Sequence, residues 1–450
     1  MFSFRSILLA LLAPLALSSA RAEADTNRLD LAQAIDQAVR YNFDQMRRRL
    51  AASIPALQVE LEMADFEWQV RPFFGVESSE KEVTLSRLGA SLDRRHSAGG
   101  LFQARGEWVG RAEGDEDRFV DLSFDQPLFR RFGKTYAQRA LESARFQARS
   151  AERSLESESA ALILRVVDAF SGLVRQNDRV REEEEALVRA HELLRLLELR
   201  ERQGRASRVE VMEMRMLHQE TELRLRLARE RGETLRLELA EWIGRVPEQM
   251  PALAEPAIPR LPERPLAHLQ AMAWTNRVER HQALDAYEDA RRRVRVEKRE
   301  RYPDLRLLSR WRPVGSEDVG SWFVGVSGGR TLDLKTTDIR IRQEEQAARA
   351  ALAEVAAVEL RLNREVQAAS SRCQAAAETL VLAEKQYALS LERLRLAGAY
   401  YRQGRADALQ WRNAESSRVA AERDLADARA ELLRGRYALL HAVGLLLGGS

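Results

Sequence analysis

Few residues in this chain could do chemistry, and the best-placed pair is Glu210 with Glu213. Two carboxylates three residues apart lie on one face of a helix, where they either attract a cation together or form an ordinary solvated face. The segment HELLR at His191 has Arg195 where a zinc-protease motif needs its second histidine, so it indicates no metal site. Because the sequence also has no glycine-rich phosphate loop and no cluster of histidines with carboxylates, we expect neither an enzyme nor a cofactor.

The elements that position Glu210 are predicted by a repeat. RQGRA occurs at Arg202 and again at Arg402, which is 200 residues later. Ahead of the first copy, apolar and small residues recur at the heptad spacing that is typical of long helices packed as coiled coils. Each of these first-half positions is matched by an apolar or small residue 200 positions later. The first-half positions form two heptad series, Leu141, Ala148, Leu155, Leu162, Ala169 and Val166, Leu173, Val180, Leu187, Leu194.

Each half is therefore predicted to contain a helix of about 70 residues, a turn at RQGRA and a returning helix of about 40 residues. A long helix of that size needs partner helices along its whole length. The equal spacing predicts two helical hairpins that stand side by side with their tips at one height.

Short segments ahead of each long helix alternate apolar and polar residues, which is typical of β-strands. They are 71–79, 117–127, 303–311 and 321–329. Strands of about ten residues are long enough to cross a membrane in a tilted barrel. The segment 81–117 is either an extra hairpin or a long extracellular loop, and a small soluble β-domain carried by the coiled coil is the alternative interpretation of all these strands.

The ends of the two halves are marked by composition. Residues 1–22 read as a secretory signal peptide, and half of the twelve prolines fall in 247–265, which predicts an extended linker. The predicted repeats are therefore 23–246 and 266–450. No later segment has the 18 consecutive apolar residues of a membrane helix, so any membrane-spanning part must be β. Four strands are too few to close a barrel, so copies of the chain would have to share one.

Several segments resemble the TolC-like outer-membrane efflux protein family. LDLAQAIDQAVRYNFDQM at 29–46 is similar to the family's opening helix, and LSFDQPLFRRFGKTYAQRA at 122–140 to its strand-to-helix junction. RPLAHLQAMAWTNRVERHQAL at 264–284 is similar to the start of its second half, and the two RQGRA sites resemble its helix tips. The order of these motifs, together with the repeat and the signal peptide, makes the resemblance specific.

The resemblance implies a mainly α fold in which long hairpins from two repeats form a periplasmic α-barrel, with four short transmembrane strands per chain in a trimeric β-barrel. It also implies a homotrimeric channel-tunnel of the outer membrane, which exports solutes or polypeptides as part of a tripartite efflux or type I secretion complex. The implied partners are a periplasmic adaptor protein, an inner-membrane pump of the RND, MFS or ABC type, and outer-membrane lipids.

The resemblance also assigns roles to the tips. Gly204 with Arg205, and Gly404 with Arg405, would dock the adaptor, although the family usually has an apolar residue after the glycine. Family members narrow the entrance with acidic residues six and nine positions after the tip glycine. In this chain the residues at those positions are Glu210 and Glu213 in the first half, and Gln410 and Asn413 in the second half. Since only the first half is acidic, the resemblance does not decide whether the channel selects cations. The second half also lacks the Gln-Pro-Leu step and has SGGRTLDL at 327–334.

Arginine and aromatic residues gather where strands meet helices, which predicts a ring at the inner headgroup level of the outer membrane. The set is Trp68, Arg71, Phe129, Arg130, Arg131, Arg301, Tyr302 and Arg330. Chance in an arginine-rich chain is the alternative, since only five of the 72 basic residues are lysines.

Two other classes of protein compete with the channel. A periplasmic adaptor also has long hairpins, but usually has one hairpin, an anchor and β-rich halves on both sides. A soluble periplasmic coiled-coil scaffold without a pore is the second alternative. We expect no nucleic acid partner, because an exported chain does not meet one and its net charge is only +3.

Overall fold

The computed structural model describes residues 28–79, 82–111, 116–204, 206–259, 264–313, 320–330, 334–402 and 408–447. The chain divides into two compact units, each of which takes segments from both halves of the sequence. The first unit is Met1–Arg47, Glu156–Arg277 and Arg361–Ser450, and the second is Arg48–Leu155 and Val278–Leu360.

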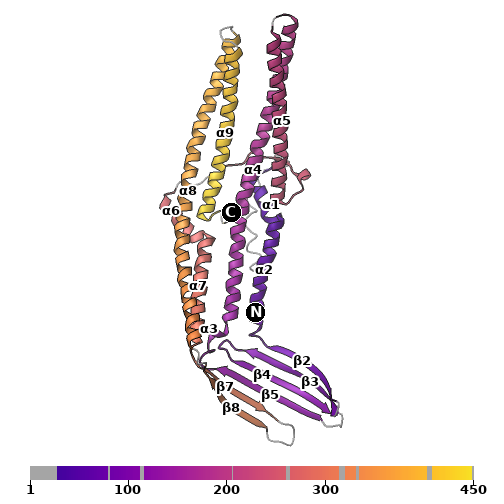
Figure 1. Cartoon of the computed structure of the whole chain (residues 1–450), viewed down its shortest axis with the longest axis vertical. Helices are drawn as coiled ribbons and strands as arrows, with labels where there is room; N and C mark the ends of the chain where they lie inside the picture. The colour runs from indigo at the N-terminus through magenta and orange to yellow at the C-terminus, as the bar shows by residue number, and fades with distance from the viewer. Residues whose placement is uncertain are drawn as a thin grey trace, which may run out of the picture. The chain divides into compact units, whose positions relative to one another are not determined.

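Two long helical hairpins form as the heptads predict (Figure 1). The first pairs α4, Arg139–Arg202, with α5, Arg208–Ile243, and the second pairs α8, Leu334–Arg402, with α9, Ala408–Val443. The long helices have 64 and 69 residues, and the returning helices have 36 residues each at positions offset by 200. None of the predicted seam residues is exposed, so the heptad pattern identified the packed faces correctly.

Shorter helices precede each hairpin. In the first half they are α1, Leu31–Tyr41, and α2, Phe43–Ala64, and a short α3, Lys134–Ala137, leads into α4. In the second half they are α6, Leu266–Asn276, and α7, Val278–Arg299. None of the helices in the described part of the chain is long and apolar enough to cross a membrane.

The core of the first unit lies where α1 packs against α4 and α5. Phe170, Leu239 and Ile243 are completely buried there, and buried alanines of α1 allow the helices to approach closely. Beside this core, β1, Arg28–Leu29, pairs in parallel with β6, Ala252–Leu253, while Pro247–Gln249 form a 3₁₀ turn, η2. The proline-rich segment is therefore tied to the start of the chain by a short strand.

The returning helices end in the same way in both hairpins. Gly244 and Gly444 have φ of 68° and 79°, the left-handed conformation that closes a helix and favours glycine. After α1, the Asn42 amide donates to the carbonyl of Trp242 at 3.0 Å; after α6, the Arg277 guanidinium donates to the carbonyl of His441 at 3.0 Å. The carbonyls left over at each helix end thus gain a donor from the helix break beside them.

The second unit contains one antiparallel sheet in the order β2-β3-β4-β5-β7-β8 (Figure 1). All four expected strands are present, as β2, Gln69–Ser79, β5, Glu116–Pro127, β7, Asp304–Arg312, and β8, Ser321–Gly329. The segment 81–117 adds two more, β3, Glu82–Arg95, and β4, Leu101–Arg111.

The expected count of four strands per chain is therefore wrong, and the sheet has six. The physical reason is a tight turn in the middle of that segment. His96 N–H donates to the Gly100 carbonyl at 2.6 Å, and Gly99 has φ of 96°, so the chain can reverse and pair eleven residues of β3 with β4. Of the two alternatives left open by the sequence, the extra hairpin is the one that forms.

Candidate functional site

The sheet has one apolar face that is open. Cross-strand partners in an antiparallel sheet point to the same side, so the register assigns every strand residue to a face. One face carries most of the large apolar side chains, each more than a third exposed; they are Val70, Phe74, Val76, Leu88, Val120, Phe124, Trp311, Trp322, Val324 and Val326. An open apolar surface of this extent in a single chain marks a face that meets lipid or protein.

The opposite face is charged and cross-linked by ion pairs. Arg105 lies 3.1 Å from Glu107, and Arg306 bridges from β7 to Asp125 of β5 at 3.2 Å. Further pairs join neighbouring strands, namely Arg71–Asp93, Arg87–Glu107, Arg310–Asp121 and Arg312–Asp121. Apolar residues on one side and paired charges on the other are the pattern of a sheet that separates lipid from water.

The residues of the predicted interface ring lie at one end of this sheet, where β2 and β7 begin and β5 and β8 end. Trp68 packs edge-on against Phe102 with ring centroids 5.6 Å apart, and the Arg94 guanidinium lies 5.1 Å from the Trp68 ring centroid. Phe129 and Tyr302 are about half exposed, at 50 % and 56 %. Arg71, Arg131 and Arg330 are also exposed.

Two of the predicted ring arginines are held by ion pairs that the sequence does not reveal. Arg130 Nε donates to Glu300 Oε2 at 2.5 Å, and the Tyr136 hydroxyl donates to the other oxygen of Glu300 at 2.8 Å. Arg301 pairs with Asp338 at 2.6 Å. Partners 170 residues apart leave no local pattern, so no spacing in the sequence could have identified them.

The turn at the first hairpin tip is built on Gly204. Its φ is 66°, and its N–H donates to the Glu201 carbonyl at 2.8 Å. Arg205, Gly404 and Arg405 lie outside the described residues. The structure therefore shows a glycine turn in the first hairpin and leaves the docking assignment of the tips as a proposal.

Glu210 has a structural role that the sequence analysis missed. Ser207 is the N-cap of α5; its hydroxyl accepts from Glu210 N–H at 3.2 Å, and the Glu210 carboxylate accepts from Ser207 N–H at 2.8 Å. This capping box has the recognisable spacing Ser-x-x-Glu, so the signal was available. Glu210, Glu213, Gln410 and Asn413 are all exposed in the single chain, which leaves their side chains accessible to solvent at the start of α5 and α9.

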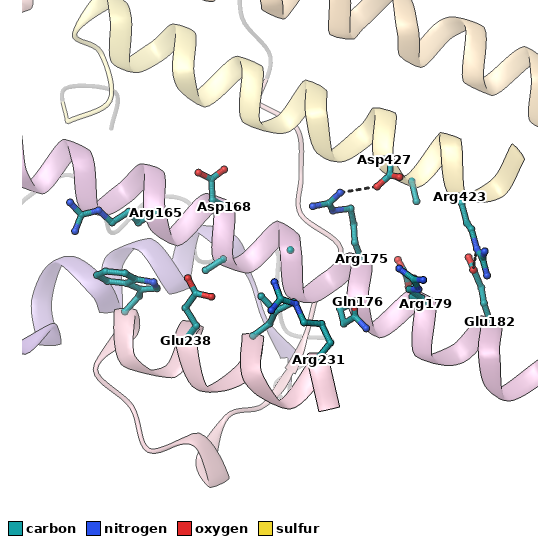
Figure 2. Close-up of a pocket in the computed structure, with 16 residues that line it drawn as sticks. Arg165, Asp168, Arg175, Gln176, Arg179, Glu182, Arg231, Glu238, Arg423 and Asp427 are labelled. Atoms are coloured by element: carbon teal, nitrogen blue, oxygen red, sulfur yellow. Dashed lines mark hydrogen bonds and ion pairs between the residues drawn. The ribbon is translucent and has the colours of Figure 1, made fainter. Parts of the chain in front are cut away.

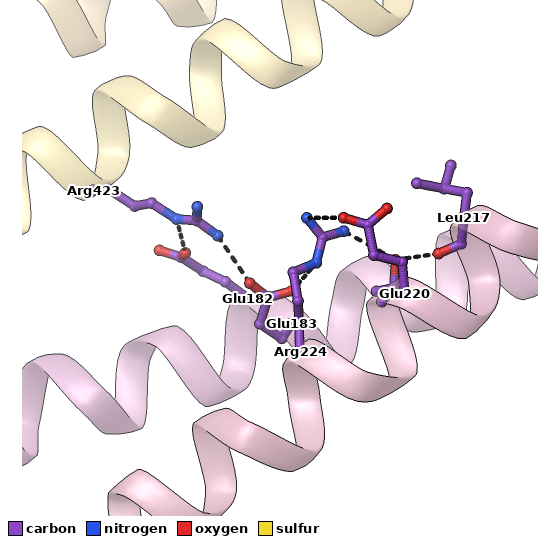
Figure 3. Close-up of polar contacts among 7 residues, drawn as sticks. Glu182, Glu183, Leu217, Glu220, Arg224 and Arg423 are labelled. Atoms are coloured by element: carbon purple, nitrogen blue, oxygen red, sulfur yellow. Dashed lines mark hydrogen bonds and ion pairs between the residues drawn. The ribbon is translucent and has the colours of Figure 1, made fainter.

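Ion pairs also join the first hairpin to α9 (Figure 3). Arg423 of α9 reaches Glu182 at 2.6 Å and Glu183 at 3.4 Å, while Arg224 of α5 approaches Glu183 at 3.7 Å. The Glu183 side chain is only 5 % exposed, so its charge depends on these two arginines. The charged segment REEEE at 181–185 therefore includes a buried link between three helices.

A cavity of about 650 Å³ lies beside these contacts (Figure 2). Arg175 crosses it to Asp427 at 2.8 Å, and the Arg165 guanidinium stacks on the Trp242 ring at 5.3 Å. Partial burial raises the pKa of the nearby Asp178 carboxyl, which the Arg181 charge partly offsets. Since arginines and carboxylates both line the cavity, its charge does not favour a ligand of one sign.

The outer side of α2 carries an exposed apolar stripe. Its residues are spaced three or four apart and are 57–78 % exposed; they are Phe43, Met46, Leu50, Ile54, Leu57 and Leu61. The opposite side includes Gln45, which is buried and donates to Ser159. The apolar stripe of α2 is therefore on the side that faces away from its polar contact with Ser159, and it is exposed in the single chain.

Comparison with solved structures establishes the fold. OprN, an outer-membrane channel, superposes with a TM-score of 0.68 at 21 % identity over 92 % of this chain and 89 % of that one. VceC of Vibrio cholerae gives 0.66 at 16 % identity over 92 % and 96 %. MtrE of Neisseria gonorrhoeae, in its open state, gives 0.63 at 18 % identity over 92 % and 89 %. Among curated proteins, none matches the sequence.

Residues 277–445 match the outer membrane efflux protein family. That range covers the second hairpin together with α7, β7 and β8, and the fold agrees along most of the chain. The resemblance to TolC-like outer-membrane efflux proteins is therefore confirmed.

The match to this family over residues 277–445, together with the shared fold, supports the predicted function of an outer-membrane channel of an efflux system, and nothing supports the adaptor or scaffold alternative. The predicted location, with the helices in the periplasm, is confirmed as well. Channels of this family are trimers that work with an adaptor and an inner-membrane pump, and the family is one of transport proteins.

Proposed function

We propose that three copies of this chain form one continuous export channel, with the sheets in the outer membrane and the hairpins in the periplasm. The two-faced sheet carries this proposal. Its open apolar face is suited to lipid, and its ion-paired face is suited to a water-filled path, so the same strands serve both environments. The solute passes through the channel, and no bond is made or broken.

The membrane-interface ring belongs to the same proposal. Trp68, Phe129 and Tyr302 lie at the end of the sheet that leads into the helices, which is where aromatic side chains anchor a protein at the headgroup level. Arg131 and Arg330 are exposed at that end and would meet lipid phosphates, whereas Arg71 belongs to the ion-paired face, where it lies 3.9 Å from Asp93.

The hairpin tips would form the periplasmic entrance and receive the adaptor. Arg205 and Arg405 follow the tip glycines, and a cation there would pair with acidic groups of an adaptor hairpin. Crosslinking of the adaptor to an Arg205→Glu, Arg405→Glu variant tests this. We expect lost crosslinking with normal trimers, and normal crosslinking would refute the assignment.

The channel itself is tested by purification from outer membranes. We expect heat-modifiable trimers that conduct ions when they are inserted into planar lipid bilayers. Monomers without conductance, or trimers that never appear in the outer-membrane fraction, would contradict the proposal.

A further inference from the structure

Two of the six histidines in this chain meet across the first hairpin. His191 lies on α4 and His218 on α5, and their ring centroids are 5.7 Å apart with the ring planes tilted by 53°. His191 is exposed and His218 is half-buried, so the pair is open to solvent on one side. We propose that His191 and His218 form a binding site for a borderline divalent transition-metal ion, such as Cu²⁺, Ni²⁺ or Zn²⁺.

The ring separation suits a shared metal ion. A metal–nitrogen distance of about 2.0–2.1 Å places the centre of a ligating imidazole ring about 3.2 Å from the metal. Two such rings are then about 5.2 Å apart at a tetrahedral angle and about 6.4 Å apart at most. The observed 5.7 Å lies between these limits, so the separation of the two rings is compatible with one ion that is shared by a nitrogen of each ring.

The two ligands are held by rigid elements. Each histidine is on a long helix, and the helices are packed along the same seam, which buries Thr221 next to His218. Ligands presented by packed helices are preorganised and lose little freedom when the ion binds. A bound ion would therefore cross-link α4 and α5 about four helical turns from the hairpin tip.

Two of the arginines around the pair are held in ion pairs. On the side toward the tip, Arg215 pairs with Glu198 at 2.7 Å. On the other side, Arg224 approaches Glu183 at 3.7 Å. An incoming cation thus meets two arginines whose charges are compensated, together with the exposed Arg195 one turn after His191.

Within the described part of the chain, no third His, Cys, Asp or Glu joins the pair to make a group of three ligands. The site is therefore a two-ligand site, in which water or an added chelator completes the coordination. The motif HELLR did not reveal it, because its partner is 27 residues away on the returning helix rather than four residues away on the same one.

The most direct test of the site uses a copper chelate that has free coordination positions. Cu²⁺ is bound most tightly by nitrogen ligands in the divalent series, and Cu²⁺–iminodiacetate leaves room for two imidazoles. With tag-free trimer, we expect one copper per chain and an electron paramagnetic resonance spectrum with two imidazole nitrogens on the metal. A signal from a single imidazole would overturn the proposal without any substitution.

Variants then assign the ligands. His191→Ala and His218→Ala should each weaken binding by at least about tenfold, because one ligand no longer brings the ion to the other. The double variant should bind at least as weakly as either single one, and His281→Ala, which removes a histidine of α7, should bind like the unchanged protein. Equal affinity in the unchanged protein and in both single variants would show adventitious copper only and would refute the site. Conductance of the same trimers reports folding independently, so loss of the channel is distinguishable from loss of the site.

Discussion

Glu210 has one observed role and one proposed role at the start of α5. Its carboxylate accepts the Ser207 N–H and its own N–H donates to the Ser207 hydroxyl, so it is part of the capping box that starts α5. It is also exposed, as a pore residue must be. The two roles differ in what they require, since capping needs an acceptor and cation attraction needs a charge.

Replacing Glu210 with Gln separates those roles. Glutamine at this position still completes a capping box, so stability should be unchanged, while the cation preference of the single channel should fall because three negative charges are lost from the trimer. Ser207→Ala is the matched control, expected to cost about 1 kcal/mol of stability without changing selectivity. An unchanged permeability ratio for Glu210→Gln would remove Glu210 from the pore.

The two faces of the sheet can be compared at neighbouring residues. Val324 belongs to the apolar face and Phe323 to the other face, and both are 57 % exposed. Val324→Lys should prevent membrane assembly, because a lysine near the bilayer midplane costs about 2–4 kcal/mol, whereas Phe323→Lys should be tolerated. The measurement is the fraction of heat-modifiable trimer in outer membranes, and equal yields would mean that the faces are assigned wrongly.

At the scale of elements, the hairpins and four of the six strands were predictable from sequence, whereas β3 and β4 were left open. Heptad positions such as Leu162 and Val366 are repeated often enough to define long helices and their packed faces. The strands β3 and β4 depend on the turn at His96–Gly100, and a single turn within a long polar segment is a weak signal. Contacts such as Arg423–Glu183 join residues 240 positions apart, so only the fold reveals them.

Helix ends provide one element-scale prediction. A Cβ at Gly244 would lie 2.4 Å from the Tyr41 carbonyl oxygen, and φ there is +68°, so Gly244→Ala should destabilise the first unit by about 1–3 kcal/mol. Gly232 is the control: it lies inside α5 with its nearest neighbour 3.7 Å away, and Gly232→Ala should be neutral or stabilising by up to about 1 kcal/mol. Chemical denaturation of the two variants measures the difference, and equal stabilities would contradict the helix-end assignment.

The ion pairs between α9 and α4 provide a second prediction at the scale of elements. Arg423→Gln removes the partner of Glu182 and leaves the buried Glu183 with Arg224 alone, so we expect a loss of about 1–3 kcal/mol and faster amide hydrogen exchange in α9 near residue 423. Arg429→Gln is the control, because Arg429 pairs with a Glu255 side chain that is 77 % exposed. Similar exchange in both variants would show that the buried link is not important for α9.

At the scale of the whole molecule, we expect α2 to contribute to the contact between copies of the chain in the trimer. Its apolar stripe is exposed in the single chain, and a trimer offers a neighbouring copy to cover it. Leu57→Glu should therefore reduce trimer formation, while Ala51→Glu, on an exposed part of the same helix outside the stripe, should not. Size-exclusion chromatography with light scattering measures this, and intact trimers of Leu57→Glu would place the interface elsewhere.

The returning helices α5 and α9 have equal length and an offset of 200 residues. One residue inserted into a single hairpin would lengthen it by about 1.5 Å and turn every later side chain by about 100° around the helix axis. The hairpin would then differ from its counterpart in both tip height and packed face. Evolution of this chain is thus restricted in how it can change length: insertions and deletions should be accepted in both hairpins together and in steps that preserve the heptad, about seven residues at a time. Among relatives, variation in the reach of the periplasmic part should therefore be stepwise rather than continuous.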